Sequence, residues 1–255
     1  MNIIKNSFNL IKYDKSVSYY LKKLIKNFSY KSLSDLGTCL CDAEDKGIKI
    51  ILNSVDSIKL GRTLLLQSYN QHPDTVNAFA LQIALLERNN DFQTVSDMSE
   101  SAKVLNNSFV INNIAYAKYN LGLFEEALDL QKYAVKIDIE TDYRHILLQY
   151  NLLLFELSCG YNNLYKYDLN KFLEMLICDD VYDYESAIIF AIFTDNYNFV
   201  KHNIDIYNKT FIAEKEALEI INNYMQNKIK PTASDVLKVI KPKTVYGKAL
   251  YDSAK

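Results

Sequence analysis

Small residues recur at regular intervals between residues 112 and 138, and this spacing strongly constrains the fold. Ala115, Ala127 and Ala134 are separated by large apolar residues, and Gly122 lies between two apolar stretches. Two antiparallel helices can pack closely where small side chains of one helix meet large side chains of the other. Glycine adopts a left-handed backbone at little cost, so we expect Gly122 to end the first helix. The stretch therefore predicts a helical hairpin.

The same pattern extends along the chain of 255 residues, which contains only six glycines and three prolines. Folds with many turns need more of both residue types. Apolar residues recur at i, i+3, i+4 and i+7, the spacing of one helix face, and no segment alternates as a strand does. We expect an all-α fold with helices over residues 15–28, 33–44, the fifties and sixties up to His72, 76–88, 92–105, 109–121, 124–137, 143–158, 164–177, 185–193, 197–207, 212–226 and a short stretch after Pro231.

Residues 108–141 resemble a tetratricopeptide repeat, a helix–turn–helix unit of 34 residues. Lys118 and Gln131 stand where that family prefers large apolar residues, and Ile139 replaces its closing proline. The signature positions that match are Ile111, Ile114, Ala115, Gly122, Phe124, Ala127 and Ala134. Residues 76–107 match fairly well, through Phe79, Leu86, Phe92 and Ala102, and a degenerate unit before them retains Gly61, Ser68 and Pro73.

The resemblance implies one domain over residues 1–255, a right-handed superhelix (α-solenoid) of antiparallel helical hairpins that stack on one another. Its parts are N-terminal helices in 1–74, the best repeats in 75–141, degenerate hairpins in 142–210 and capping helices in 211–255. The family uses the first helix of each repeat to line a concave groove that binds another protein. Carried over, this implicates Asn112, Tyr116, Tyr119 and Asn120 in the better repeat and Asn77, Glu87 and Arg88 in the weaker one.

The net charge of −2 is unevenly distributed along the chain. Residues 1–35 and 226–255 each carry +5, whereas residues 36–225 carry −12. The densest acidic stretch contains Asp179, Asp180, Tyr182, Asp183, Tyr184 and Glu185. These carboxylates either stabilise the start of the next helix in a solvated loop, or form with the tyrosines a contact surface for a basic protein. Binding of nucleic acid is not expected, because the pI is near 6.0 and no aromatic stacking platform is present.

Motifs for catalysis are missing from the sequence. It has no phosphate-binding glycine loop and no H-E-x-x-H zinc motif, so we expect no cofactor, no metal and no small-molecule substrate. Cys39 and Cys41 are expected to be small buried residues. His145, with Glu140 and Asp142 before it, leaves open an enzyme hypothesis in which the imidazole acts as a general base.

The composition also bears on location. No apolar run approaches the roughly 20 residues of a membrane helix, and four scattered cysteines do not form a disulfide framework. We therefore expect a cytoplasmic protein without a membrane segment.

Together these features predict a non-catalytic module for binding another protein. The acidic middle and a composition rich in Asn, Lys and Ile, typical of AT-rich genomes, favour a small bacterial inhibitor or immunity-type protein. Its partner would be a basic effector such as a nuclease toxin. The alternatives are a secretion chaperone or assembly adaptor, a helical-repeat enzyme with a site near His145, and a regulator that binds a signalling peptide.

Overall fold

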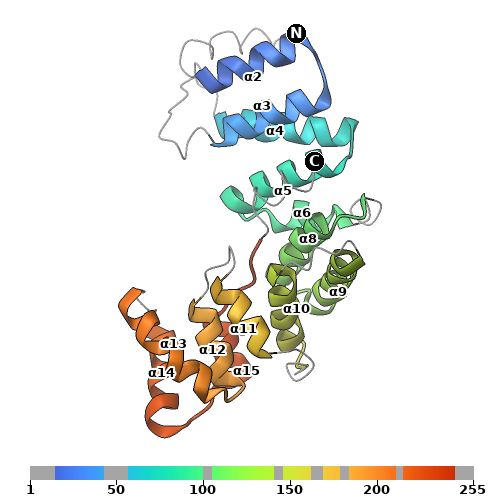
Figure 1. Cartoon of the computed structure of the whole chain (residues 1–255). Helices are drawn as coiled ribbons and strands as arrows, with labels where there is room; N and C mark the ends of the chain where they lie inside the picture. The colour runs from blue at the N-terminus through green and yellow to red at the C-terminus, as the bar shows by residue number, and fades with distance from the viewer. Residues whose placement is uncertain are drawn as a thin grey trace. The chain divides into compact units, whose positions relative to one another are not determined.

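A computed structural model describes residues 15–42, 57–99, 105–140, 146–161, 169–178, 184–210 and 215–244. Over these residues the chain forms thirteen α-helices and no β-strand (Figure 1), which confirms the all-α prediction. This arrangement is compatible with a helical-repeat fold. The chain divides into two compact units, residues 1–117 with 246–255 and residues 118–245, and the division falls within α8 (Ser108–Asn120).

Unit 1 is built from helices that pack on their neighbours in sequence, since α2 contacts α3, α3 contacts α4 and α4 contacts α5. A cluster of buried leucines lies between the first three of these helices: Leu21, Leu33, Leu36, Leu40 and Leu64. Besides the greater part of α8, the helices of unit 1 are α2 (Lys15–Lys26), α3 (Tyr30–Asp42), α4 (Ser57–Gln71), α5 (Thr75–Asn89) and α6 (Phe92–Ser96).

One predicted helix of unit 1 is interrupted by a turn. The prediction placed it over residues 92–105; α6 ends at Ser96, and a turn follows at Asp97 and Met98. Ser99 and Leu105 are again helical, and residues 100–104 lie outside the described residues. Apolar spacing alone therefore did not reveal the interruption.

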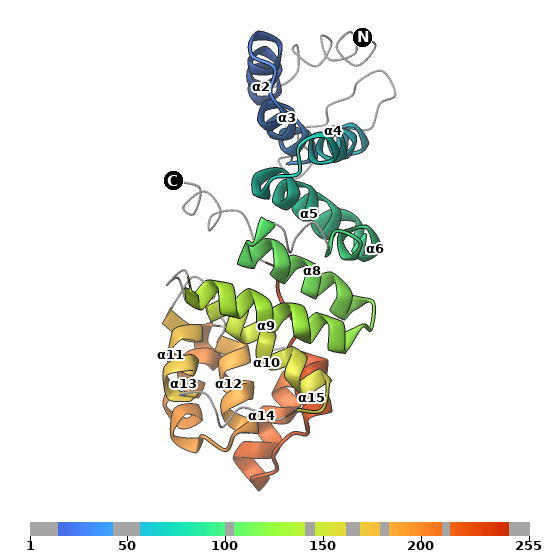
Figure 2. The ribbon, with the colours of Figure 1, turned by 90° about the vertical axis from the view of Figure 1, so that its right-hand side faces the viewer.

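Unit 2 is organised around α12 (Tyr184–Phe193), which contacts α11, α13, α14 and α15 (Figure 2). Every residue from Ser186 to Ile192 is buried, as expected for a helix that is apolar on all sides. In the same unit, α9 packs on α10. The other helices of unit 2 are α9 (Phe124–Glu140), α10 (Ile146–Ser158), α11 (Leu169–Cys178), α13 (Tyr197–Thr210), α14 (Lys215–Asn227) and α15 (Ala233–Val239).

Three helix ends in unit 2 share one turn geometry. Gly122, Gly160 and Asp195 follow α8, α10 and α12 with φ of 79°, 78° and 63°. In each turn the next backbone N–H donates to a carbonyl oxygen five residues earlier, over 3.0, 2.8 and 2.7 Å respectively. This pattern is a Schellman motif, which stops a helix and reverses the chain. It confirms the expected left-handed conformation of Gly122.

No helix in the described part of the chain combines the length and the apolar character that a bilayer crossing requires.

Candidate protein-binding surfaces

Two of the predicted groove residues are buried. Asn77 is 1% exposed, and its amide nitrogen donates to the carbonyl oxygen of His72 over 2.9 Å. Its amide oxygen lies 3.0 Å from the hydroxyl of Ser68, which also lies 2.7 Å from the carbonyl oxygen of Tyr30. Asn112 is 0% exposed and donates to Asn113 over 3.4 Å. Because Asn77 contacts Ser68 of α4 and both amides are buried, we leave Asn77 and Asn112 out of any contact surface.

The other predicted groove residues are distributed differently. Tyr116 is half-buried in unit 1, where its ring meets Phe92 edge-on at 6.1 Å. Tyr119 is half-buried in unit 2, where it stacks on Phe155 at 5.0 Å. Asn120 is exposed. Two further residues of the prediction, Glu87 and Arg88, lie in α5, but their side chains are outside the described structure.

The acidic stretch is described only at its end. Asp179, Asp180, Tyr182 and Asp183 lie outside the described residues, as does His145. Tyr184 and Glu185 open α12, and Glu185 accepts a hydrogen bond of 2.5 Å from the hydroxyl of Tyr207 in α13. Glu185 thus links two helices, while the recognition role predicted for the stretch remains a prediction.

The two cysteines of the C-x-C pair occupy different environments. Cys41 is 2% exposed, as expected of a small core residue, and Cys39 is half-buried. No cluster of metal-binding side chains is found in the described ranges.

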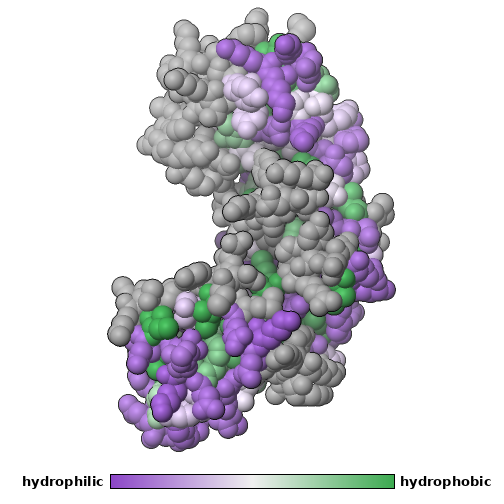
Figure 3. Space-filling model, viewed as in Figure 1, coloured by the Kyte–Doolittle hydropathy of each residue, from purple (hydrophilic) through white to green (hydrophobic). Residues whose placement is uncertain are grey.

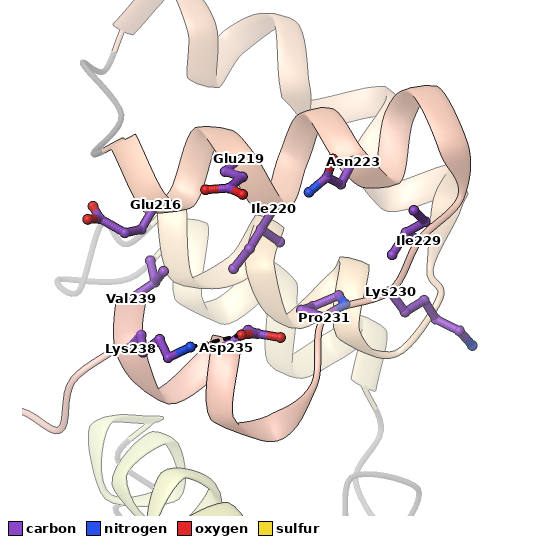
Figure 4. A pocket seen from close by; sticks show the side chains of 10 residues that line it. All are labelled: Glu216, Glu219, Ile220, Asn223, Ile229, Lys230, Pro231, Asp235, Lys238 and Val239. Carbon is purple, nitrogen blue, oxygen red and sulfur yellow. Dashed lines mark hydrogen bonds and ion pairs between the residues drawn. The ribbon is translucent and has the colours of Figure 1, made fainter.

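A groove between α14 and α15 was not predicted from the sequence (Figure 4). Its volume is about 330 Å³, and its apolar lining comes from Ile220 of α14, Val239 of α15 and the connecting residues Ile229 and Pro231. Figure 4 shows Ile220 pointing into the space between the two helices. Three carboxylates border this apolar strip: Glu216, Glu219 and Asp235.

The charges at the groove are unequally paired. Two lysines also line the groove: Lys238 lies 3.2 Å from Asp235, and Lys230 lies 3.4 Å from Asp195. Glu216 and Glu219 form no hydrogen bond or ion pair with the described residues. They are exposed and lie three positions apart on one face of α14. Among the described residues, the groove therefore has two carboxylates without a partner beside its apolar lining.

Contacts at the far end of α14 hold this helix in place. The hydroxyl of Tyr224 donates to Asp195 over 2.8 Å, and the ammonium of Lys228 lies 3.6 Å from the ring centre of Tyr197. Burial, together with the hydrogen bond to Asp195, raises the pKa of Tyr224 to about 12. The hydrogen bond from Tyr224 and that from Lys230 lower the pKa of Asp195. The groove thus rests on a helix tied to the turn between α12 and α13.

A second hollow, of about 410 Å³, lies at the turns after α8 and α10. Its apolar side is formed by Leu123 and Phe124, which are 39% and 40% exposed. On the other side lie Ser158 and Cys159. Burial and the nearby carboxylate of Glu125 raise the pKa of the Cys159 thiol to about 11, so the thiol is protonated at neutral pH.

The two units also differ in net charge. Residues 118–245 contain fourteen lysines and arginines against nineteen aspartates and glutamates, which gives −5. The remaining residues, those of unit 1, carry +3. In Figure 3 the surface around α13 and α14 is mostly hydrophilic, with a few hydrophobic residues among the polar ones. Glu216 and Glu219 of the groove thus belong to the acidic unit.

Comparisons with family models, with curated proteins and with solved structures give no match for this chain. The resemblance of residues 108–141 to a tetratricopeptide repeat therefore stays a prediction.

Proposed function

We propose that this chain is a non-catalytic protein-binding module whose partner is a basic protein. The partner class that fits best is an effector such as a nuclease toxin, which the chain would neutralise in the manner of an immunity protein. The observation that carries the proposal is the groove between α14 and α15, where Glu216 and Glu219 lack partners among the described residues beside an apolar strip.

The groove matches the chemistry of a lysine or arginine side chain. Such a side chain has an apolar stem and a charged head, so it can pack against apolar surface and still reach a carboxylate. Ile220 and Val239 would contact the stem, and Glu216 and Glu219 would pair with the head. The charge of −5 on unit 2 would attract a basic partner over distances beyond direct contact.

Kinetic measurements with a captured partner test this proposal. Partners are isolated on the immobilised chain at low salt, and binding is then measured by surface plasmon resonance at two salt concentrations. The double variant Glu216→Gln/Glu219→Gln should lower the association rate roughly tenfold at low salt, with a smaller change in dissociation.

The matched control is Glu174→Gln/Asp205→Asn, which removes two exposed carboxylates from α11 and α13. It alters the net charge equally but leaves the groove intact, so its association rate should stay within about twofold of the wild type. Equal effects of the two variants, or an association rate indifferent to salt, would contradict a role for the groove.

A second function, as a secretion chaperone or assembly adaptor, is favoured by the hollow at Leu123 and Phe124. Exposed apolar side chains around a hollow suit an apolar segment of a client protein. Phe124→Asp would then weaken binding of the client, whereas Glu216→Gln/Glu219→Gln would leave it unchanged. A binder of a basic effector should show the opposite pattern.

A further inference from the structure

The segment that follows α15 lies in an extended conformation against α10. Ile240 has φ of −93° and ψ of 128°, and residues 240–244 form no helix or strand. Ile240 and Thr244 are 2% and 5% exposed, and Pro242 between them is also buried. Residues 240, 242 and 244 are thus buried in unit 2 in a segment without helix or strand, whereas Lys241 is exposed and Lys243 is half-buried. We call this segment the strap.

Side chains of α10 bind the strap through its main chain. The amide nitrogen of Asn151 donates to the carbonyl oxygen of Lys243 over 2.6 Å, and the N–H of Lys243 donates to the amide oxygen of Asn151 over 2.8 Å. The hydroxyl of Tyr150 donates to the carbonyl oxygen of Lys241 over 2.9 Å. The contacted residues, Lys241 and Lys243, are two positions apart, which is the repeat of an extended chain. Asn151 is 0% exposed, and its two hydrogen bonds to the half-buried Lys243 are partly buried.

The side chains of the strap contribute features that depend on its sequence. Pro242 favours the extended conformation, and it occupies the position between the two main-chain contacts, where no N–H is used. The ammonium of Lys243 lies 5.3 Å from the ring centre of Tyr150, a cation–π distance. Lys241 is exposed and donates to the carbonyl oxygen of Leu237 in α15. The bound unit is therefore an extended Lys-Pro-Lys sequence.

We propose that α10 carries a docking site for an extended Lys-Pro-Lys segment, and that the strap fills this site as an internal ligand that can be released. A short segment held mainly by side-chain contacts can open without unfolding of the surrounding helices. Another protein that presents an extended segment of the same chemistry then competes for Tyr150 and Asn151. This last step rests on the proposed function, because it requires a basic partner, whereas the internal site does not.

The first test uses the full chain and a labelled peptide, acetyl-Val-Ile-Lys-Pro-Lys-Thr-amide, the sequence of residues 239–244. Lys243→Pro in the chain removes the N–H that binds Asn151, so the site is freed from its internal ligand. A hidden site lowers the apparent affinity by the fraction of molecules in which it is open. We expect fluorescence anisotropy to show peptide binding at least about tenfold tighter to this variant than to the wild type.

Two controls identify the contact. The first control is a peptide methylated at the main-chain nitrogen of its second lysine, which cannot donate to Asn151. The second control is Asn151→Ala in the Lys243→Pro background, which removes the side-chain amide that accepts this hydrogen bond. Each should weaken binding by at least about tenfold. Equal binding of the methylated and unmethylated peptides, or of wild type and Lys243→Pro, would overturn the proposal. These outcomes are independent of any effector, so they separate this inference from the proposed function.

A second measurement needs no variant. Hydrogen exchange of the wild-type chain should show the amide of Lys243 exchanging at least about tenfold faster than amides of α12 such as Ile189. An amide of Lys243 protected as strongly as those of α12 would mean that the strap opens only on unfolding, and the proposal would fail.

Discussion

Gly37 in α3 and Gly61 in α4 bring the backbones of their two helices into contact. A methyl group at Gly61 would lie 2.6 Å from the carbonyl oxygen of Gly37, and one at Gly37 would lie 2.9 Å from the carbonyl oxygen of Gly61. Both distances are too short for a contact between a methyl carbon and a carbonyl oxygen. The carbonyl groups belong to the main chain, so they cannot rotate away as a side chain could. Glycine is therefore required on both sides of this crossing.

Gly61→Ala should destabilise unit 1, because α3 and α4 must move apart to accept the methyl group. Overpacking of this kind costs about 1–3 kcal/mol. Thermal denaturation followed by circular dichroism measures the effect. The control Gln67→Ala, at an exposed position of the same helix, should leave the melting temperature unchanged. A Gly61→Ala protein as stable as the wild type would mean that the two helices are farther apart.

Gly122 responds to substitution for a different reason. It has space around it, with no atom within 4 Å of an added methyl group, but its φ of 79° is strained for most side chains. Gly122→Ala should cost about 1 kcal/mol. Gly122→Asn should cost less, because asparagine tolerates this conformation and already adopts it at Asn90. Urea denaturation of both variants checks this order, and an alanine variant more stable than the asparagine variant would refute it.

Ala127 in α9 is 0% exposed, which agrees with its predicted position at a helix contact. Ala127→Leu should overpack this site and lower the unfolding free energy by about 1–3 kcal/mol. Asp129→Leu, at an exposed position of the same helix, serves as the size-matched control and should change stability by less than about 0.5 kcal/mol. Similar melting temperatures for Ala127→Leu and the wild type would show that α9 is rotated relative to this assignment.

Tyr119→Ala should destabilise unit 2. The resemblance to a tetratricopeptide repeat places Tyr119 in a groove that binds a partner. In the structure the ring stacks on Phe155 at 5.0 Å and the hydroxyl accepts a hydrogen bond from Ser158 at 3.3 Å. Loss of these contacts should cost about 1–2 kcal/mol, whereas Tyr119→Phe keeps the stacking and should cost less. Equal stability of the alanine and phenylalanine variants, measured by urea denaturation, would contradict this assignment.

The pair Tyr224 and Asp195 predicts a pH dependence of stability. The pKa of Tyr224 is raised to about 12, so the folded chain binds this proton more tightly than the unfolded chain, whose tyrosine has an ordinary value of 10.0. The associated stability is complete below pH 10 and is lost as the pH rises toward 12. The difference in unfolding free energy between wild type and Tyr224→Phe should therefore shrink over this interval. Denaturant titrations at pH 8, 10 and 11 measure it, and a constant difference would exclude the linkage.

Helix positions were largely readable from the sequence, and the errors have local causes. The helix expected to begin at residue 33 begins at Tyr30, because the hydroxyl of Ser29 accepts a hydrogen bond from the N–H of Ser32 and so caps the helix. Apolar spacing begins only at Leu33, so it could not reveal this start. A serine three positions before another polar residue was the available signal, and it is weak.

The candidate surfaces were much less predictable. Spacing places Asn112 on a defined helix face, but it does not tell whether that face is covered, and buried amides are satisfied by partners that only the fold supplies. The groove of Glu216 and Glu219 needs α15 opposite α14, and the contact of Asn151 with Lys243 joins residues 92 positions apart. Local patterns carry no information on such pairs.

Because the strap is synthesised after α10, unit 2 cannot complete its fold until the strap has been made. A ribosome adds roughly 5–20 residues per second, so Asn151 is made about 5–18 s before Lys243, which lies 92 residues later. Until residues 240–244 emerge from the exit tunnel, α10 presents Tyr150 and Asn151 without their main-chain partners. A nascent chain therefore passes through a period in which this face is open to chaperones or to another polypeptide, and translation speed across the last helices sets its length.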